Sequence, residues 1–156
     1  MHALAEQSEL KLTPFVAKDA KALAALHSRC FPRPWKAEDF RRYADMSAYP
    51  GLLAWSGPRL AGFLIVSIAA DEAEILSIGV GRDWQRQGVG RALVESLIAS
   101  ARRKEARRLF LDVAESNQAA LALYSSLGFT RMARRKDYYL FPDGRREDAL
   151  LMVRTL

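Results

Sequence analysis

Residues 78–91 read Ile-Gly-Val-Gly-Arg-Asp-Trp-Gln-Arg-Gln-Gly-Val-Gly-Arg. The apolar run Ile75–Val80 leads into this stretch and predicts a buried strand, and a helical pattern of apolar residues follows it. Gly88 and Gly90 lack a Cβ atom, so a ligand can approach main-chain N–H groups closely. The N-terminus of the helix behind them adds unpaired N–H donors and a partial positive charge, which favour a phosphate. The stretch therefore predicts a strand, a phosphate-binding loop and a helix in succession.

Two arginines enclose the glycines of this loop. Arg86 and Arg91 add formal charge and forked donors that suit phosphate oxygens. The spacing is not the Gly-x-Gly-x-x-Gly of a dinucleotide site, and the Gly-Lys-Ser/Thr of a P-loop is missing, so both are set aside. The alternative is a glycine-containing turn before an ordinary helix. Because the glycines lie between two arginines, we favour a diphosphate ligand, with these candidate contacts: Arg86, Gln87, Gly88, Val89, Gly90 and Arg91.

The loop lies inside a strand–helix–strand unit. Strands are expected at 74–80 and 109–114, and the helix between them carries one apolar stripe, Leu93, Val94, Leu97, Ile98 and Ala101. Such a unit joins two parallel strands by a crossover. Further strands are expected at 10–15, 52–55, 60–68, 130–141 and 147–153, and further helices at 17–29, 36–46 and 117–127. The pattern predicts an α/β (α+β) fold, a central mixed and mostly antiparallel sheet with helices on both faces.

The composition is that of a soluble globular protein. The 156 residues are 50% hydrophobic and 27% charged, which predicts one domain, residues 1–156, with a loose lead-in at residues 1–8. The net charge of +6 permits attraction to nucleic acid or to an anionic ligand. The basic cluster at residues 102–108 has no interleaved aromatic residues, so a solvated helix end explains it and no direct nucleic-acid contact is required.

Cysteine usage and the N-terminus bear on the compartment. Cys30 is the single cysteine, so no internal disulfide can form, and a reducing compartment is expected. The N-terminus has no apolar segment of the secretory kind, and the longest apolar run, residues 60–70, is too short to span a bilayer. These features predict a cytoplasmic protein with no membrane partner.

Four polar residues are candidates for chemistry, and each has a structural alternative. Asp112 lies inside the apolar run 109–113, where a charge is costly, so it is either functional or paired with an arginine or water. Asn117 could bind a cofactor or cap a helix. Tyr124 could donate a proton, or its ring could simply fill the core. Glu74 opens the strand before the glycine loop and is a rival base to Asp112, unless it is a surface charge at the strand end.

The chain resembles the GCN5-related N-acetyltransferase (GNAT) family, whose pyrophosphate loop has the pattern Arg/Gln-x-x-Gly-x-Gly/Ala. Within that family it resembles the branch that acetylates the N-terminal alanine of a ribosomal protein. The residues that carry this resemblance are Cys30-Phe31-Pro32-Arg33-Pro34-Trp35, the loop 86–91, Glu115-Ser116-Asn117-Gln118-Ala119-Ala120-Leu121-Ala122-Leu123-Tyr124, Leu127-Gly128-Phe129, Tyr138-Tyr139, Asp143-Gly144-Arg145 and Glu147-Asp148-Ala149. Together they span roughly residues 10 to 153.

The resemblance implies acetyl-CoA as cosubstrate, no metal, and a role for several residues. The family's general base is a glutamate that falls on Asp112, one methylene shorter, and its general-acid tyrosine falls on Tyr124. Its cofactor-binding asparagine falls on Asn117, and main-chain contacts to the acetyl group and pantetheine fall on Ile78, Gly79 and Val80.

The acceptor implied by the resemblance is the N-terminal alanine of a small-subunit ribosomal protein. Trp35, Tyr138 and Tyr139 are candidates for the wall of the acceptor pocket, because aromatic surfaces can hold a short peptide. Two alternatives remain open: an acetyltransferase for a small amine or a lysine side chain, and a catalytically silent acyl-CoA-binding module. The sequence indicates no particular oligomeric state.

Overall fold

A computed structural model describes residues 9–46 and 51–156 of the chain. The lead-in expected at residues 1–8 lies outside the described residues. The strands are β1 (Leu10–Pro14), β2 (Gly51–Ser56), β3 (Arg59–Ala69), β4 (Glu72–Val80), β5 (Arg108–Ala114), β6 (Thr130–Leu140) and β7 (Arg146–Thr155). The α-helices are α1 (Ala20–Cys30), α2 (Ala37–Met46), α3 (Val89–Arg103) and α4 (Gln118–Ser126), and two short 3₁₀ helices are η1 (Ala17–Asp19) and η2 (Arg82–Trp84).

The strands form one seven-stranded sheet in the order β1-β2-β3-β4-β5-β7-β6. Neighbours pair antiparallel except β4 and β5, which pair parallel because α3 crosses over between them. The predicted mixed α/β fold is therefore confirmed, including its parallel pair.

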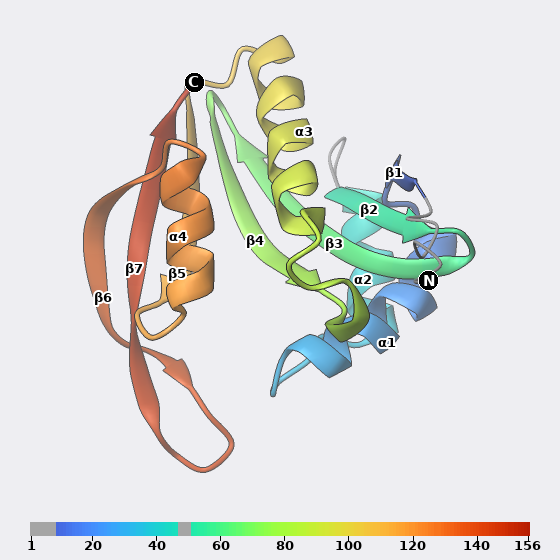
Figure 1. Cartoon of the computed structure of the whole chain (residues 1–156), viewed down its shortest axis with the longest axis horizontal. Helices are drawn as coiled ribbons and strands as arrows, with labels where there is room; N and C mark the ends of the chain where they lie inside the picture. Colours follow the sequence, from blue (N-terminus) through green and yellow to red (C-terminus); the bar gives the residue numbers. More distant parts are fainter. Residues whose placement is uncertain (1–8, 47–50) are drawn as a thin grey trace, which may run out of the picture.

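Helices cover both faces of this sheet, and each face has its own core. Along β3, Phe63 and Ile65 point to the core under α1 and α2, whereas Leu64 and Val66 point to the core under α3 and α4. This alternation follows from the two-residue period of a strand. Figure 1 shows α3 over the β3–β4 part of the sheet and α4 over the part that holds β5 and β7. Each fully buried Leu or Phe stabilises the fold by about 1.5–3 kcal/mol.

The parallel pair β4–β5 is short, and this positions the site. Its register runs only from Glu72–Arg108 to Ile75–Leu111, although β4 continues to Val80 and β5 to Ala114. Beyond that point β4 pairs with β3 and β5 pairs with β7, and no described strand covers the edges that face each other. In Figure 1 the two parts of the sheet spread apart from a common end. The second half of β4 is less buried than its apolar sequence predicted, and Leu76 is 39% exposed.

In the part of the chain that the structure describes, every helix is too short or too polar to cross a membrane.

Candidate active site

The glycine loop after β4 presents a row of main-chain donors. Gly88 is the N-cap of α3 and has φ 81°, a left-handed conformation that glycine adopts without strain. Arg86 also has a positive φ of 64°. The first helical N–H that finds an acceptor is that of Ala92, which donates to the Gly88 carbonyl at 3.0 Å. No described group accepts from the N–H groups of residues 86–91, so the loop has free donors at a helix N-terminus, as an anion site needs.

Gly90 has a packing role that the sequence did not reveal. A Cβ atom at this position would lie 3.3 Å from Cδ2 of Leu123, so the missing side chain lets the first turn of α3 approach α4. At Gly88, by contrast, a Cβ would meet nothing within 4 Å, and the positive φ is what requires glycine there.

The two arginines of the loop behave differently. The Arg91 guanidinium donates to the Ser126 hydroxyl at 2.6 Å and lies 3.7 Å from Glu95, so it ties α3 to α4. Among described residues, no side chain or main-chain group pairs with Arg86. Arg86 is therefore the arginine of this loop whose charge is available to a phosphate.

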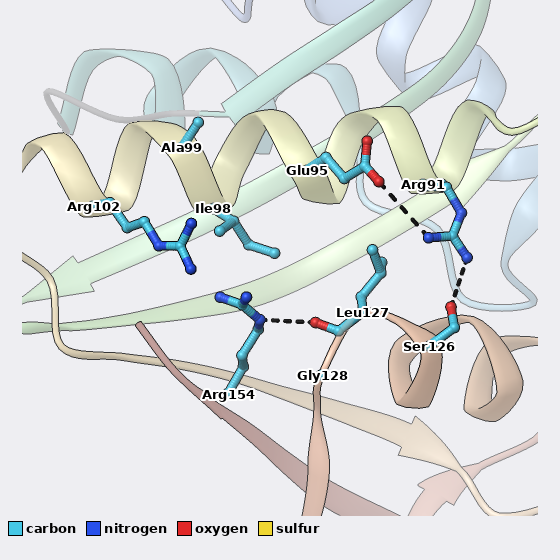
Figure 2. A pocket seen from close by; sticks show the side chains of 9 residues that line it. All are labelled: Arg91, Glu95, Ile98, Ala99, Arg102, Ser126, Leu127, Gly128 and Arg154. Atoms are coloured by element: carbon cyan, nitrogen blue, oxygen red, sulfur yellow. Dashed lines mark hydrogen bonds and ion pairs between the residues drawn. The ribbon is translucent and has the colours of Figure 1, made fainter.

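A basic groove continues along α3 from Arg91 (Figure 2). Its volume is about 520 Å³, and it is lined by Arg91, Glu95, Ile98, Ala99, Arg102, Ser126, Leu127, Gly128 and Arg154. Arg154 on β7 donates through Nε to the Leu127 carbonyl at 2.8 Å, while its Nη1 is buried with no partner in the described residues. Figure 2 shows Arg102 and Arg154 directed into the same space. Two converging cations and an orphaned buried donor suit an anion. Sequence reasoning assigned Arg102 to a solvated helix end and did not select Arg154, because a strand and a helix far apart in the chain bring the two residues together.

Asp112 is nearly buried and ion-paired. Its neighbours Leu111 and Val113 enter the core under α4, so the alternation along β5 turns Asp112 to the other face of the sheet. Its side chain is 10% exposed, and Oδ1 lies 3.0 Å from Nε of Arg135 on β6. The structure thus shows the arginine pairing that the sequence left open, and it identifies a partner that the sequence could not.

A bulge in β6 places the two candidate tyrosines. The pairing of β6 with β7 shifts between Arg135 and Tyr139, and Asp137 inside the bulge has φ 52°. Tyr138 is half exposed, and its ring meets that of Tyr139 edge-on with centroids 5.1 Å apart. Burial, followed by the negative charge of Asp112, raises the pKa of both phenols. The two tyrosines and Asp112 therefore lie close enough to influence one another.

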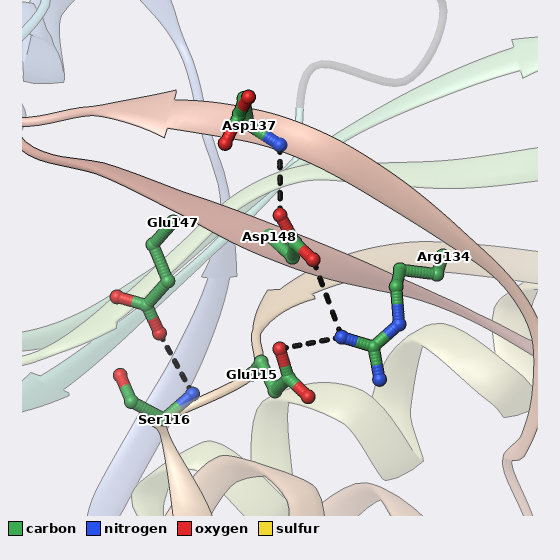
Figure 3. Close-up of polar contacts among 6 residues, drawn as sticks. All are labelled: Glu115, Ser116, Arg134, Asp137, Glu147 and Asp148. Carbon is green, nitrogen blue, oxygen red and sulfur yellow. Dashed lines mark hydrogen bonds and ion pairs between the residues drawn. The ribbon is translucent and has the colours of Figure 1, made fainter.

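Carboxylates hold this bulge in place (Figure 3). Asp148 accepts a hydrogen bond from the Asp137 N–H at 2.8 Å and lies 3.2 Å from Arg134, and these contacts lower its pKa. Arg134 also pairs with Glu115 at 2.6 Å. Glu147 accepts a hydrogen bond from the Ser116 main-chain N–H at 2.7 Å, and this bond holds the start of β7 against the loop before α4. The acidic residues of the predicted Glu-Asp-Ala motif thus fix the loops around the tyrosines.

Asn117 and Tyr124 lie on α4. The Asn117 side chain accepts from the Ala120 N–H at 3.1 Å, which is the helix cap that the sequence offered as an alternative. Tyr124 is 5% exposed and packs edge-on against Phe129. Burial raises the pKa of its phenol to about 12, and no described group hydrogen-bonds the hydroxyl. The charge on Tyr124 also contributes to the raised pKa of Tyr139. Tyr124, on α4, therefore lies near the cluster that contains Tyr139 and Asp112.

Trp35 and Glu74 lie on the α1–α2 side of the sheet. Trp35 packs against the core under these helices, and its main-chain N–H donates to Nδ1 of His27 at 3.1 Å. Glu74 is half-buried, and its negative charge contributes to the raised pKa values of Tyr43 and Tyr138. The structure therefore gathers Asp112, Tyr138, Tyr139 and Tyr124, with Glu74 nearby, and anchors Trp35 through a histidine that sequence reasoning did not select.

The described residues contain no group of three or more His, Cys, Asp and Glu side chains arranged to hold a metal.

Comparisons with known proteins connect this geometry to a family. The sequence profile of the acetyltransferase (GNAT) family matches residues 20–129. The "[Ribosomal protein bS18]-alanine N-acetyltransferase" of Escherichia coli (strain K12) is 39% identical over 135 residues, which cover 86% of this chain and 90% of that protein.

Two solved structures show the same fold. The crystal structure of the ribosomal-protein-S18-alanine N-acetyltransferase from Escherichia coli superposes with a TM-score of 0.84 at 34% identity and covers 94% of each chain. Arabidopsis thaliana NAA60 in complex with acetyl-CoA superposes with a TM-score of 0.84 at 20% identity, covering 95% of this chain and 99% of that one.

Proposed function

The chain belongs to the acetyltransferase (GNAT) family and is an acetyl-CoA-dependent N-acetyltransferase, and on that premise we propose that its acceptor is the N-terminal alanine α-amine of a small-subunit ribosomal protein. The relative from Escherichia coli, 39% identical over 135 residues, carries that acceptor in its name. The observation in the structure that supports it most is the separation of β4 from β5 between the donor loop and the cluster of Asp112 and tyrosines. We also propose that residues 1–156 act as one domain, in the cytoplasm, where ribosomal proteins are made.

The residues present fit acetyl-CoA as cosubstrate. The free N–H groups of residues 86–91 and the Arg86 guanidinium would hold the pyrophosphate. The basic groove would take the phosphorylated nucleotide end, because Arg102 lies there together with Nη1 of Arg154, which has no partner among the described residues. Ile78, Gly79 and Val80, on the part of β4 that leaves β5, would make the main-chain contacts to pantetheine and the acetyl group. Acetyl-CoA supplies the acetyl group as an activated thioester.

The protein's own side chains would accept and donate the protons of the reaction. A substrate α-amine has a pKa of about 8, so at neutral pH much of it is the unreactive ammonium. Asp112 would accept that proton, directly or through water, once the ammonium replaces the Arg135 guanidinium beside it. Tyr124 holds its proton at neutral pH, since its pKa is raised to about 12, and is suited to donate it to the leaving thiolate. Asn117 would contact the cosubstrate at the N-terminus of α4.

The wall of the acceptor pocket would take residues from both halves of the sheet, which divides where β4 and β5 stop pairing. Tyr138 and Tyr139 stand on the β6 bulge beside Asp112, and Trp35 stands on the loop between α1 and α2. Aromatic rings of this kind can hold a short peptide.

A panel of acceptors tests the proposal. The purified protein would be given acetyl-CoA with an alanine-starting peptide, a lysine peptide with a blocked N-terminus, and a polyamine. We expect kcat/KM for the alanine-starting peptide to exceed the others by at least about 100-fold. Preference for the lysine peptide or the polyamine would identify a different acetyltransferase. Absence of turnover with every acceptor, with acetyl-CoA still bound, would identify a silent binding module.

A further inference from the structure

His27 is the one polar side chain that is fully buried among the described residues, with 2% exposure. It lies on α1, and its ring is enclosed by aromatic rings of the core under α1 and α2. The centroid of Phe31 is 4.5 Å away and that of Trp35 is 5.4 Å away, both stacked, and Phe40 and Phe63 lie at 5.3 and 5.4 Å. A buried polar ring in such surroundings needs a partner for each nitrogen.

Both ring nitrogens have partners, and the partners fix the tautomer. The main-chain N–H of Trp35 donates to Nδ1 at 3.1 Å, so Nδ1 is the unprotonated nitrogen. Nε2 therefore carries the proton and donates to the Ser77 hydroxyl at 3.1 Å. The neutral ring thus connects the loop that carries Trp35 to the part of β4 that has separated from β5.

This ring is the polar anchor of the loop between α1 and α2. Residues 32–35 include Pro32 and Pro34, which have no N–H to donate. Within the described residues, the bond from Trp35 to His27 is the one hydrogen bond that ties residues 32–35 to the rest of the chain. Ser77 lies one residue before Ile78–Val80, the segment assigned to the acetyl group. Trp35 is thereby held at a fixed place relative to that segment.

We propose that His27 is a positioning residue for the acceptor site: it holds the Trp35 loop against β4 and so sets one wall of the pocket that receives the substrate peptide. The inference rests on the proposed function, because it assigns Trp35 to an acceptor wall. It predicts an effect on peptide binding that a residue serving only global stability would not produce.

Two substitutions separate the two hydrogen bonds of the ring. In His27→Asn the side-chain oxygen can take the place of Nδ1 and still accept from Trp35, whereas the bond to Ser77 is lost. In His27→Gln the amide nitrogen can take the place of Nε2 and still donate to Ser77, whereas the main-chain N–H of Trp35 loses its acceptor. Ser28→Ala is the matched control, since its exposed hydroxyl bonds only the Ala25 carbonyl of the same helix.

Steady-state kinetics with the alanine-starting peptide provide the first readout. We expect His27→Gln to raise the KM for the peptide about tenfold, while the KM for acetyl-CoA and kcat at saturating peptide stay within about twofold of wild type. His27→Asn should keep the peptide KM within about threefold, and Ser28→Ala should match wild type. An unchanged peptide KM in folded His27→Gln, or equal losses for both substrates in both variants, overturns the inference.

Fluorescence provides a readout that does not depend on the acceptor. In a Trp55→Phe/Trp84→Phe background, Trp35 is the remaining tryptophan. Acrylamide quenching of Trp35 should rise about twofold in His27→Gln and stay near wild type in His27→Asn. Unchanged quenching in His27→Gln overturns the inference while leaving the proposed function intact. If wild-type protein acetylates no α-amine peptide, the proposed function fails and the acceptor role of His27 fails with it.

Discussion

The Arg135 guanidinium lies 3.0 Å from the Asp112 carboxylate, which is only 10% exposed and stands inside the otherwise apolar run 109–113 of β5. The ion pair explains how an aspartate can occupy this position, because a buried carboxylate without a partner would be costly. It also sets a condition for catalysis, since a substrate ammonium must share or replace the contact with Arg135. Asp112 therefore has a structural role at rest and a proposed chemical role when substrate is bound.

Substitution of Asp112 distinguishes these roles. Asp112→Asn keeps the shape but removes the proton acceptor, so kcat should fall about 100-fold or more at pH 7. Raising the pH to about 9 should restore part of the loss, because more of the acceptor amine is then unprotonated. Asp112→Glu should stay active. A stopped assay of CoA release across pH 6–9 measures the rates of all three proteins. An Asp112→Asn protein as fast as wild type would exclude Asp112 as the base and leave Glu74 as the candidate.

Tyr124→Phe tests the proton donor. The substitution keeps the ring and its edge-on contact with Phe129, so the domain should remain folded. The turnover rate should fall about 100-fold, while acetyl-CoA affinity stays near wild type, because the hydroxyl acts only when the thiolate leaves. Calorimetric titration and kcat are the two measurements. A large loss of affinity with unchanged kcat would instead indicate a binding role.

The arginines of the phosphate loop should contribute unequally. Arg86 has no described partner, whereas Arg91 is engaged by Ser126 and Glu95. Arg86→Gln should therefore weaken acetyl-CoA binding about tenfold, Arg91→Gln should weaken it less, and Arg103→Gln at the far end of α3 should not change it. Calorimetry with acetyl-CoA measures the three affinities. A ranking with Arg91 above Arg86 would mean that the loop rearranges when it binds.

The stability of the fold should depend on pH through His27. Burial lowers the pKa of His27 from 6.5 to about 4, so the folded state disfavours the charged ring. As the pH falls, the His27 ring takes up a proton in the unfolded chain before it does so in the folded protein. The contribution of the neutral ring to the free energy of unfolding is therefore fully present above pH 6.5 and is lost as the pH falls through 4, with a total of about 3 kcal/mol. Other acidic groups titrate in the same range, so the comparison is with His27→Gln, which cannot take up this proton.

Urea unfolding at pH 7 and pH 4.5 measures the effect. Between these pH values, wild type should lose about 2–3 kcal/mol more unfolding free energy than His27→Gln. Equal losses in the two proteins would show that His27 does not resist protonation in the folded state.

Much of the fold followed from periodicity in the sequence. The alternation in β3 is a local pattern, so this strand, expected at 60–68, is observed at Arg59–Ala69. The apolar stripe of residues 93–101 likewise predicted a helix, and the observed α3 begins earlier, at Val89, within the predicted loop 86–91. The lower burial of the second half of β4 was not predictable in this way. It depends on where β5 stops pairing, and residues far along the chain determine that point.

The candidate site was predictable to a different degree. The sequence indicated the donor loop, because the glycines, arginines and helix are contiguous. It could not identify Arg135 as the partner of Asp112 or Arg154 as part of the basic groove, since each contact joins two distant segments. The sequence does not single out His27, and only its burial between Trp35 and Ser77 reveals a role. The role of Gly90 in the approach of α3 to α4 likewise depends on Leu123.

The position of the transferred acetyl group tests the central proposal most directly. A peptide with an N-terminal alanine and one internal lysine would be incubated with acetyl-CoA and the wild-type protein, and fragment masses would locate the modification. The same peptide with a blocked N-terminus is the matched control. We predict acetylation of the alanine α-amine alone and an unmodified control peptide. Acetylation of the lysine in both peptides, with the α-amine left free, would contradict the proposal.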